Sequence, residues 1–505
     1  MTAHASLTHE TKSPRHLNLW FVLAFAVAAA LRIFRLGTKS FWLDEATSAV
    51  LAQADRSIFI SAIIHRQANM VLYYILLRGW IRLGNSEFVI RCLSVIAGVA
   101  AIPAIYLLGT RLFGPKAGRI AALLLSVHAF HIRYSQEARG YSLFMLTAIL
   151  SSLFFLRTLE RPSRKNWAAY ILLSVLMVYA QVFGGWVLLA QWMSLLFLRR
   201  EVRGRQLLFS AAMICLLIAP LAYCLLFVSD RSQLYWATKP TLQDLYKFGM
   251  DITGEGRPLL LLACVALILG GVAAGFSRER SHFNIADTWK YWFLLFWLIL
   301  PIALIWAISL RWPAFEPRFL ICCLPPLVLL VADAATRIRS QVLFAATLMI
   351  LLGLSLSGTF SYYRSRADAD HTDDWRDATR SLLSQAEAGD AVLFSYSEER
   401  LAFDEYQRQF HVTGSPIREF PEQTDLELLT LRPSRPNAAL LHTIAAGYRR
   451  VWVVSAFQPN RASRQVEAML QAHFRERGDQ NFGFVHADLF SDRIASPADQ
   501  PRNSP

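Results

Sequence analysis

The chain has 505 residues, of which 54% are hydrophobic and only 17% charged. A soluble globular domain usually carries about a quarter charged residues, so a wholly soluble protein is excluded. The net charge of +14 does not indicate nucleic-acid binding. Most basic residues stand in short segments between apolar runs and form no basic face on a folded domain. All six cysteines also lie in apolar runs, which excludes a disulfide framework or a cysteine metal site.

Apolar runs recur from Leu17 to Phe360 and stop at Ser361. A run of about 18 or more residues can cross the hydrocarbon core of a bilayer. The first run contains Ala28-Ala29-Ala30 but is long for a signal peptide, so we expect an uncleaved helix. We predict a polytopic α-helical membrane protein with eleven spans, at residues 17–36, 87–110, 117–134, 141–158, 166–182, 183–198, 207–228, 258–276, 289–310, 317–337 and 341–360.

The connections between these spans alternate between basic and poorly charged. Because positive loops stay on the cytoplasmic side, we expect residues 1–16 to be a cytoplasmic tail and the C-terminal region to lie outside. Residues 70–84 are apolar as well, but counting them as a span would put the later basic loops outside. We therefore predict an interfacial helix there, in a long first outer loop at residues 37–86. The bilayer is expected to be the inner membrane of a bacterial cell.

The C-terminal region, residues 361–493, mixes helical and strand patterns and has no glycine-rich phosphate loop. Asp373 to Ala388 is typical of an amphipathic helix with acidic residues at its start. Short apolar runs bounded by polar residues predict buried strands, at residues 391–396, 450–456 and 482–490. A small extracytoplasmic α/β domain is the natural interpretation. The proline-containing residues 494–505 are predicted to be a disordered tail.

Polar residues that could carry chemistry gather on the predicted outer side, although their sequence spacing did not require it. Charged side chains near a bilayer are expensive, so they call for a functional hypothesis. The candidates are Trp42, Asp44 and Glu45; His65, Asn69 and Tyr74; Gln136, Glu137, Arg139 and Tyr141; and Glu316 and Arg318.

Together these residues supply what the transfer of a sugar from a polyprenyl phosphate needs. A carboxylate such as Asp44 can accept the proton of an attacking hydroxyl. Arg139 and Arg318 can stabilise the charge that grows on a departing phosphate. Trp42 and Tyr74 can line a groove for sugar or lipid.

Structural interpretations of the same residues stay open. Asp44 and Glu45 can simply begin a helix, whose N-terminus favours carboxylates. Glu137 can form a packing ion pair with Arg139. Arg318 can extend its charge to the surface along its apolar stem, and His65 can be an ordinary polar loop residue.

The motifs resemble those of bacterial GT-C glycosyltransferases, in particular the family 39-like group of Rgt-type galacturonosyltransferases, the aminoarabinose transferase of lipid A and protein O-mannosyltransferases. The resemblance extends well over residues 30–160. It departs at Asn69-Met70-Val71-Leu72-Tyr73-Tyr74, where the family often has Pro-Pro-Leu-Tyr-Tyr. The similar segments are Leu31 to Gly37, Phe41-Trp42-Leu43-Asp44-Glu45-Ala46, Gly84 to Ser94, Tyr106 to Gly114, Tyr134-Ser135-Gln136-Glu137-Ala138-Arg139-Gly140-Tyr141 and Asp374-Trp375-Arg376.

The resemblance implies an inverting transferase that uses a polyprenyl-phosphate sugar as donor. It makes Asp44 the catalytic or acceptor-positioning carboxylate and Glu45 its companion. From their chemistry and placement, we expect the other candidates to bind substrate. The acceptor is expected to be a lipid, glycan or protein, and no nucleic acid is expected to bind. No cofactor is required by the motifs, while the family leaves open a divalent metal near the outer carboxylates.

Two other classes of function compete with the transferase. A transporter or flippase of lipid-linked sugars would show helix-interrupting prolines in matching halves, and Pro103, Pro220 and Pro301 show no such symmetry. A non-catalytic membrane scaffold would leave Asp44 dispensable. We therefore expect a glycosyltransferase.

Overall fold

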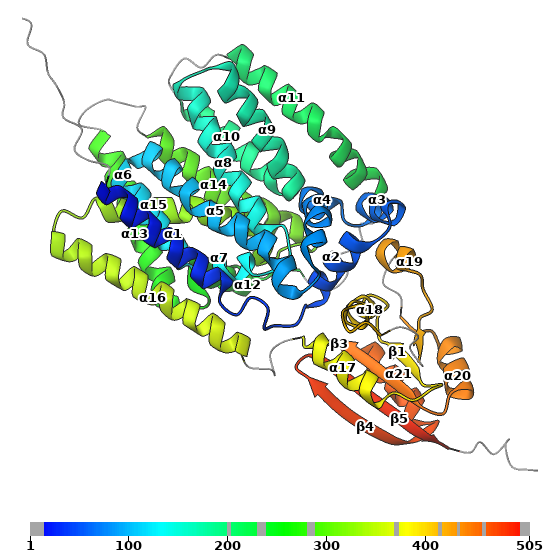
Figure 1. Ribbon diagram of the computed structural model, residues 1–505. Helices are drawn as coiled ribbons and strands as arrows, with labels where there is room; N and C mark the ends of the chain where they lie inside the picture. The colour runs from blue at the N-terminus through cyan, green and yellow to red at the C-terminus, as the bar shows by residue number, and fades with distance from the viewer. Residues whose placement is uncertain are drawn as a thin grey trace, which may run out of the picture.

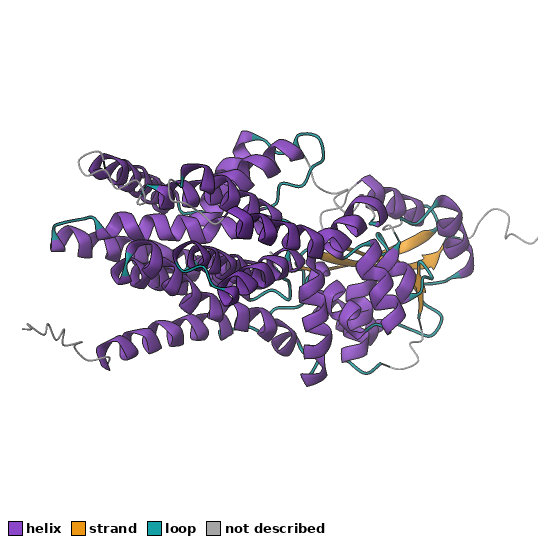
Figure 2. Ribbon diagram, turned by 90° about the horizontal axis from the view of Figure 1, so that it is seen from above, coloured by secondary structure: helices purple, strands orange, loops and turns teal. Residues whose placement is uncertain are grey.

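The computed structural model has a helical bundle and a smaller domain with a β-sheet at one end of it (Figures 1 and 2). Both views show the bundle helices roughly side by side. The structure describes residues 15–198, 204–229, 239–279, 288–367, 373–412, 417–431, 435–456 and 461–494.

Each of the eleven predicted spans coincides with a helix or a pair of helices. A gap at Val127 divides the predicted span 117–134 into α6 and α7. The helices are α1 (Arg15–Ile33), α5 (Glu87–Phe113), α6 (Pro115–Ser126) with α7 (Ala129–Ser135), α8 (Tyr141–Glu160), α9 (Arg164–Ala180), α10 (Gly184–Ser194) with η3 (Leu195–Phe197), α11 (Gly204–Tyr223) with η4 (Cys224–Val228), α13 (Pro258–Glu279), α14 (Trp289–Ser309), η6 (Pro317–Cys323) with α15 (Leu324–Thr336), and α16 (Gln341–Ala367).

The count of eleven full spans is not confirmed. Among the described residues, six helices are long and apolar enough to cross a membrane, and a seventh if the bent pair α12 (Leu242–Gly254) and α13 counts as one span. Some of the remaining helices are short: α6 has 12 residues and α10 has 11. A helix of 12 residues extends only about 18 Å, less than the hydrocarbon core.

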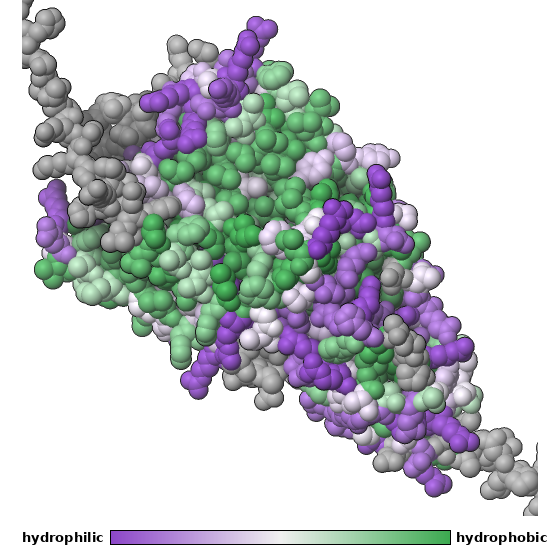
Figure 3. Space-filling model, in the orientation of Figure 1, coloured by the Kyte–Doolittle hydropathy of each residue, from purple (hydrophilic) through white to green (hydrophobic). Residues whose placement is uncertain are grey.

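The surface of the bundle is apolar between its two ends. Figure 3 shows hydrophobic side chains over the bundle and polar ones at its ends and over the sheet domain. Large apolar side chains are exposed along the outer helices, for example Leu208 on α11, Phe227 on η4, and Met349 and Phe360 on α16. Such a surface would aggregate in water and is suited to lipid. The chain is therefore a multi-pass membrane protein.

Small residues allow the central helices to approach closely. A Cβ atom added at Gly118 on α6 would lie 2.4 Å from Thr110 Oγ1 and 2.6 Å from the Tyr106 carbonyl oxygen on α5. Backbones in membrane bundles come this close only where side chains are small. This packing brings α5 and α6 close together at Gly118.

The connection between α1 and α5 carries short helices that form one end of the bundle. They are α2 (Leu43–Gln53), α3 (Arg56–His65), η1 (Ala68–Met70), α4 (Val71–Trp80) and η2 (Ile81–Leu83). The segment predicted as an interfacial helix, residues 70–84, forms α4 and η2. Ten residues of α4 extend about 15 Å, too short for a span.

The sheet domain has five strands in the order β2-β1-β3-β5-β4. β1 pairs in parallel with β2 and β3, whereas β5 is antiparallel to β3 and β4. The strands are β1 (Ala391–Phe394), β2 (Arg418–Phe420), β3 (Val451–Ala456), β4 (Phe474–Phe482) and β5 (Val485–Arg493); the helices are α17 (Trp375–Gln385), α18 (Glu399–Gln409), α19 (Asp425–Thr430), α20 (Ala438–Gly447) and α21 (Arg461–Gln471).

Two of the three predicted strands agree with β1 and β3, and the helix predicted at Asp373 to Ala388 contains α17. The third, 482–490, is shifted: it covers a turn and part of β5. In that turn Gly483, at φ 66°, begins a two-residue connection between β4 and β5, a position that favours glycine. β4 escaped prediction because its sequence, FRERGDQNF, is polar. The predicted tail lies, from residue 495 onward, outside the described residues.

The sheet domain is fixed to the short helices at the end of the bundle. The Tyr406 hydroxyl on α18 accepts a hydrogen bond from the Phe41 backbone N–H at 2.7 Å and donates to Glu87 Oε1 at 2.9 Å. Arg376 on α17 pairs with the same Glu87 at 2.6 Å, and Gln53 on α2 donates to Glu405 at 2.8 Å. The domain thus rests directly on the segment that leads into α2.

Candidate active site

The site begins at the first turn of α2, where Trp42 is the N-cap residue and Asp44 and Glu45 follow. Carboxylates are favoured there by the partial positive charge of the helix N-terminus. Successive residues of a helix point about 100° apart. Asp44 and Glu45 therefore enter different surroundings.

Glu45 is buried in an ion pair with Arg91 on α5. Arg91 Nε and Nη2 donate to the two Glu45 oxygens at 2.8 and 2.6 Å. The other three N–H groups of Arg91 bond to the backbone carbonyls of Leu36, Lys39 and Ser40 at 2.8–2.9 Å. All five donors of the guanidinium are thus used. Glu45 Oε1 also accepts the Ala138 N–H at 2.7 Å, so this pair joins α2 to two loops.

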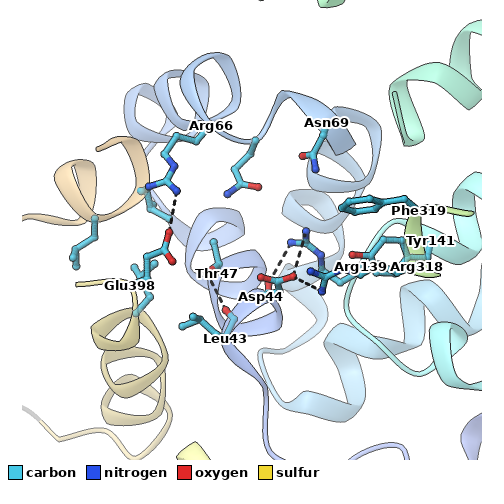
Figure 4. Close-up of a pocket in the computed structure, with 14 residues that line it drawn as sticks. Leu43, Asp44, Thr47, Arg66, Asn69, Arg139, Tyr141, Arg318, Phe319 and Glu398 are labelled. Atoms are coloured by element: carbon cyan, nitrogen blue, oxygen red, sulfur yellow. Dashed lines mark hydrogen bonds and ion pairs between the residues drawn. The ribbon is translucent and has the colours of Figure 1, made fainter. Parts of the chain in front are cut away.

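Asp44 faces a pocket and keeps a third of its side chain exposed. Its Oδ2 lies 3.1 Å from Arg318 Nη1 and 3.8 Å from Arg139 Nη2. Arg139 also donates to the Tyr74 hydroxyl at 2.9 Å, which in turn donates to Gln67. Burial raises the pKa of Tyr74, so its hydroxyl stays neutral and orients Arg139. Figure 4 shows Asp44 between the two arginines and the opposite wall of the pocket.

The pocket at Asp44, called the narrow pocket here, has a volume of about 110 Å³. Both domains form it. Arg66 reaches from the end of α3 to Glu398 of the sheet domain at 2.9 Å and also donates to the Leu431 carbonyl. Figure 4 shows this pair across the pocket from Arg139 and Arg318. The lining residues are Leu43, Asp44, Thr47, Arg66, Gln67, Asn69, Arg139, Tyr141, Arg318, Phe319, Glu398, Leu401, Leu428 and Leu429.

A second cavity, called the wide cavity here, has a volume of about 740 Å³ and shares Arg318 with the narrow pocket. Burial raises the pKa of Asp373 in its wall to about 6 and also raises the pKa of Glu137. The lining residues are Lys39, Trp42, Glu45, Arg91, Arg133, Tyr134, Gln136, Glu137, Asp251, Glu255, Glu316, Pro317, Arg318, Tyr362, Ser365, Asp373 and Phe484. Two cavities thus meet at Arg318.

The structure brings together all but one of the residues predicted from the sequence. Tyr74 lies behind Arg139, whereas His65 is exposed at the end of α3, bonds to the Ser61 carbonyl and lines neither cavity. The narrow pocket holds Asp44, Asn69, Arg139, Tyr141 and Arg318, and the wide cavity holds Trp42, Glu45, Gln136, Glu137, Glu316 and again Arg318.

Several charged residues of the site were not selected from the sequence, and three of them illustrate why. Arg91 stands inside an apolar run, where a charged residue is itself a signal of function or of a buried partner. Arg133 precedes the motif that contains Glu137 by one helical turn, a spacing that indicates an ion pair. No sequence pattern indicates Glu398, because its role depends on how the sheet domain packs against the bundle.

The residues around Asp44 do not fit a divalent metal. Asp44 has two arginines as nearest charged neighbours, where a metal would need further oxygen ligands. Within the described ranges no group of three or more His, Cys, Asp or Glu side chains could hold a metal ion.

Comparisons with known proteins identify the fold. Residues 67–223 match the family model of dolichyl-phosphate-mannose-protein mannosyltransferase, and no curated protein sequence matches. ArnT from Cupriavidus metallidurans superposes with a TM-score of 0.63 at 11% identity, over 94% of this chain and 98% of that one. The complex of ArnT with undecaprenyl phosphate superposes with a TM-score of 0.61 at 12% identity, again over 94% of this chain and 98% of that one. AglB from Archaeoglobus fulgidus, an oligosaccharyltransferase in complex with an inhibitory peptide and a dolichol-phosphate, gives 0.51 at 14% identity, over 98% of this chain and 76% of that one.

The protein therefore has the fold of a GT-C membrane glycosyltransferase, an ArnT-like helical bundle with a small C-terminal sheet domain. The resemblance drawn from the sequence motifs is confirmed, and the family model falls on the segment that contains Tyr74, Arg91 and Arg139.

Proposed function

We propose that this protein transfers a sugar, with inversion, from a polyprenyl-phosphate donor to an acceptor on the side of the membrane that carries the sheet domain. The position of Asp44 carries this proposal. It is the partly exposed carboxylate beside Arg318, the residue that lines both cavities. A transferase needs such a group where its two substrates meet.

The narrow pocket is suited to the phosphate of the donor. Three arginines, Arg66, Arg139 and Arg318, line it, and guanidinium groups bind phosphate oxygens through paired hydrogen bonds. The undecaprenyl phosphate bound to ArnT and the dolichol-phosphate bound to AglB support a lipid phosphate as the leaving group. Tyr141 and Phe319 add aromatic surface for the sugar or the first lipid units.

The transfer follows from these positions. The acceptor oxygen forms a bond to the anomeric carbon as the bond to the phosphate oxygen breaks, and the phosphate leaves with that electron pair. Asp44 takes the proton of the acceptor hydroxyl, and Arg139 and Arg318 stabilise the departing phosphate. Glu45 makes no contact with the narrow pocket. Through Arg91 it holds the first turn of α2, and with it Asp44, in place.

The proposal is tested with the polyprenyl-phosphate sugar that co-purifies with the protein, identified by mass spectrometry. The labelled donor is returned to protein in lipid nanodiscs, with an envelope extract as acceptor. We expect the label to leave the lipid and free polyprenyl phosphate to appear. Movement of intact donor between leaflets of a proteoliposome, with no cleavage, would show a transporter and contradict the proposal.

The orientation is part of the same proposal: a bacterial inner-membrane protein with a cytoplasmic N-terminus and the sheet domain outside. Arg380 on α17 is exposed. Lys116 is the second residue of α6, a helix that lies toward the end of the bundle away from the sheet domain (Figure 1). A cysteine at Arg380 should react with an impermeant thiol reagent added to intact cells, and one at Lys116 should not. Labelling at Lys116 alone would reverse the orientation.

A further inference from the structure

The wide cavity has more carboxylates than cations. Two of its cations are already engaged: Arg91 donates all five N–H groups to Glu45 and backbone carbonyls, and Arg318 lies closer to Asp44, at 3.1 Å, than to Glu316, at 4.0 Å. Its six acidic residues are Glu45, Glu137, Asp251, Glu255, Glu316 and Asp373, against Lys39, Arg91, Arg133 and Arg318.

The excess of negative charge is concentrated around Arg133. This arginine lies 3.8 Å from Glu137 Oε1 and 3.5 Å from Glu255 Oε2, so one cation serves two carboxylates. The other oxygen of each carboxylate, Glu137 Oε2 and Glu255 Oε1, is buried and makes no hydrogen bond to the part of the chain that the structure describes. Buried acceptors without partners are costly unless a ligand supplies the donors.

Two ligand classes can be compared on this basis. A phosphate in the wide cavity would add negative charge beside Glu137, Glu255 and Asp373, which is unfavourable at short range. An ammonium group would be attracted by Glu137 and Glu255, whose side chains keep 17% and 15% of their surface exposed, and would form charge-assisted hydrogen bonds with them. The cavity also presents aromatic surface from Trp42, Tyr134, Tyr362 and Phe484, which suits the flat apolar face of a sugar ring.

We infer that the wide cavity binds the acceptor, and that this acceptor is a carbohydrate with an ammonium group held by Glu137 and Glu255. This inference rests on the proposed function and deepens it. The arginine-rich narrow pocket then takes the anionic donor and the acidic wide cavity takes the cationic acceptor. Because the two cavities have opposite charge, each repels the substrate that belongs in the other cavity.

The test compares two probes with the same sugar backbone: fully deacetylated chitotriose, whose three amino groups can carry positive charge, and its fully N-acetylated form, in which neutral acetamido groups replace them. Binding to the full-length protein in lipid nanodiscs is measured near neutral pH. We expect chitotriose to bind about tenfold more tightly, the effect of one charge-assisted hydrogen bond. In a Glu137→Gln/Glu255→Gln double variant the ratio should fall to about one.

Glu160→Gln is the control for each single substitution, because it also removes one carboxylate charge and Glu160 pairs with Arg111 away from both cavities. It should keep the tenfold preference. Equal or tighter binding of the N-acetylated probe to the wild-type protein, or a preference that persists in the double variant, would overturn the inference. If the double variant fails to fold, each single substitution should still reduce the ratio, and an unchanged ratio in both would overturn it.

Cleavage of the labelled donor in the presence of an envelope extract as acceptor, measured on the same preparation, separates this inference from the proposed function. Cleavage of the donor without a preference for the cationic probe would leave a transferase whose acceptor is not cationic. Absence of cleavage would contradict the transferase itself, whatever the probes do.

Discussion

Asp44 and Glu45 are neighbours in the chain with the same functional group, yet their surroundings are opposite. Glu45 is 2% exposed and fully hydrogen-bonded to a buried arginine and a backbone N–H. Asp44 is 33% exposed, with one arginine at 3.1 Å and another at 3.8 Å, and it faces a cavity. A carboxylate whose hydrogen-bonding capacity is satisfied by the protein can only position its neighbours. One that faces open space can act on a substrate.

The largest effect on stability is expected at Glu45. Replacing it by Gln leaves Arg91 charged and buried with no anion, and breaking a buried pair from one side costs about 3–5 kcal/mol. The melting temperature of Glu45→Gln in detergent should therefore fall by several degrees. Glu160→Gln, at a pair whose side chains are 32% and 37% exposed, should cost no more than about 1 kcal/mol. Equal melting temperatures for the two variants would remove the contrast between Asp44 and Glu45.

The next effect concerns the leaving phosphate at Arg318. Removal of one such preorganised donor slows turnover by about 10²–10³-fold in enzymes, so we expect Arg318→Ala to lose about 10²-fold in steady-state transfer. Arg318→Lys keeps the charge and loses the paired hydrogen bonds of the planar guanidinium. Its turnover should lie between that of Arg318→Ala and wild type. The melting temperature of both variants should stay close to that of wild type. Unchanged turnover in both would exclude Arg318 from the reaction.

The smallest effect concerns the contact between the domains at Arg66 and Glu398. Their side chains are 7% and 22% exposed, so the pair is partly screened, and a coupling of about 1 kcal/mol is expected from a double-mutant cycle. Because Arg66 also lines the narrow pocket, Arg66→Gln should raise the apparent KM for the donor severalfold. Glu398→Gln should have a weaker effect in the same direction. A coupling energy of zero would mean that the sheet domain does not hold Arg66 in the pocket.

Much of the bundle could be predicted from the sequence, because an apolar run of membrane length is a strong local signal. The predicted count of full spans went further than the structure supports, since composition does not show that the run at 117–134 breaks at Val127 into two short helices. Likewise β1 and β3 were visible as apolar runs, whereas polar β4 is a strand only through its pairing with β5.

The candidate site could also be predicted in part, because the charges of the loops are a local signal of orientation. Loop charge alone predicted that Asp44, Arg139 and Arg318 lie on one side of the membrane. In the structure a guanidinium nitrogen of each arginine lies within 4 Å of Asp44 Oδ2. The sequence could not show that Glu45 forms an ion pair with Arg91, 46 residues away, or that Glu398 forms part of the wall of the narrow pocket. Both depend on contacts between distant segments, which leave no local pattern.

The most direct test of the central claim is a side-by-side measurement of sugar transfer by Asp44→Asn and Glu45→Gln, each normalised to folded protein. Asparagine keeps the size of Asp44 and caps a helix well, so Asp44→Asn should fold normally and bind the donor. Without a base it should lose at least about 10²-fold in turnover. Glu45→Gln should lose stability and, because Glu45 only holds Asp44 in place, should lose much less turnover per folded molecule than Asp44→Asn. Near-normal transfer by well-folded Asp44→Asn would contradict the account.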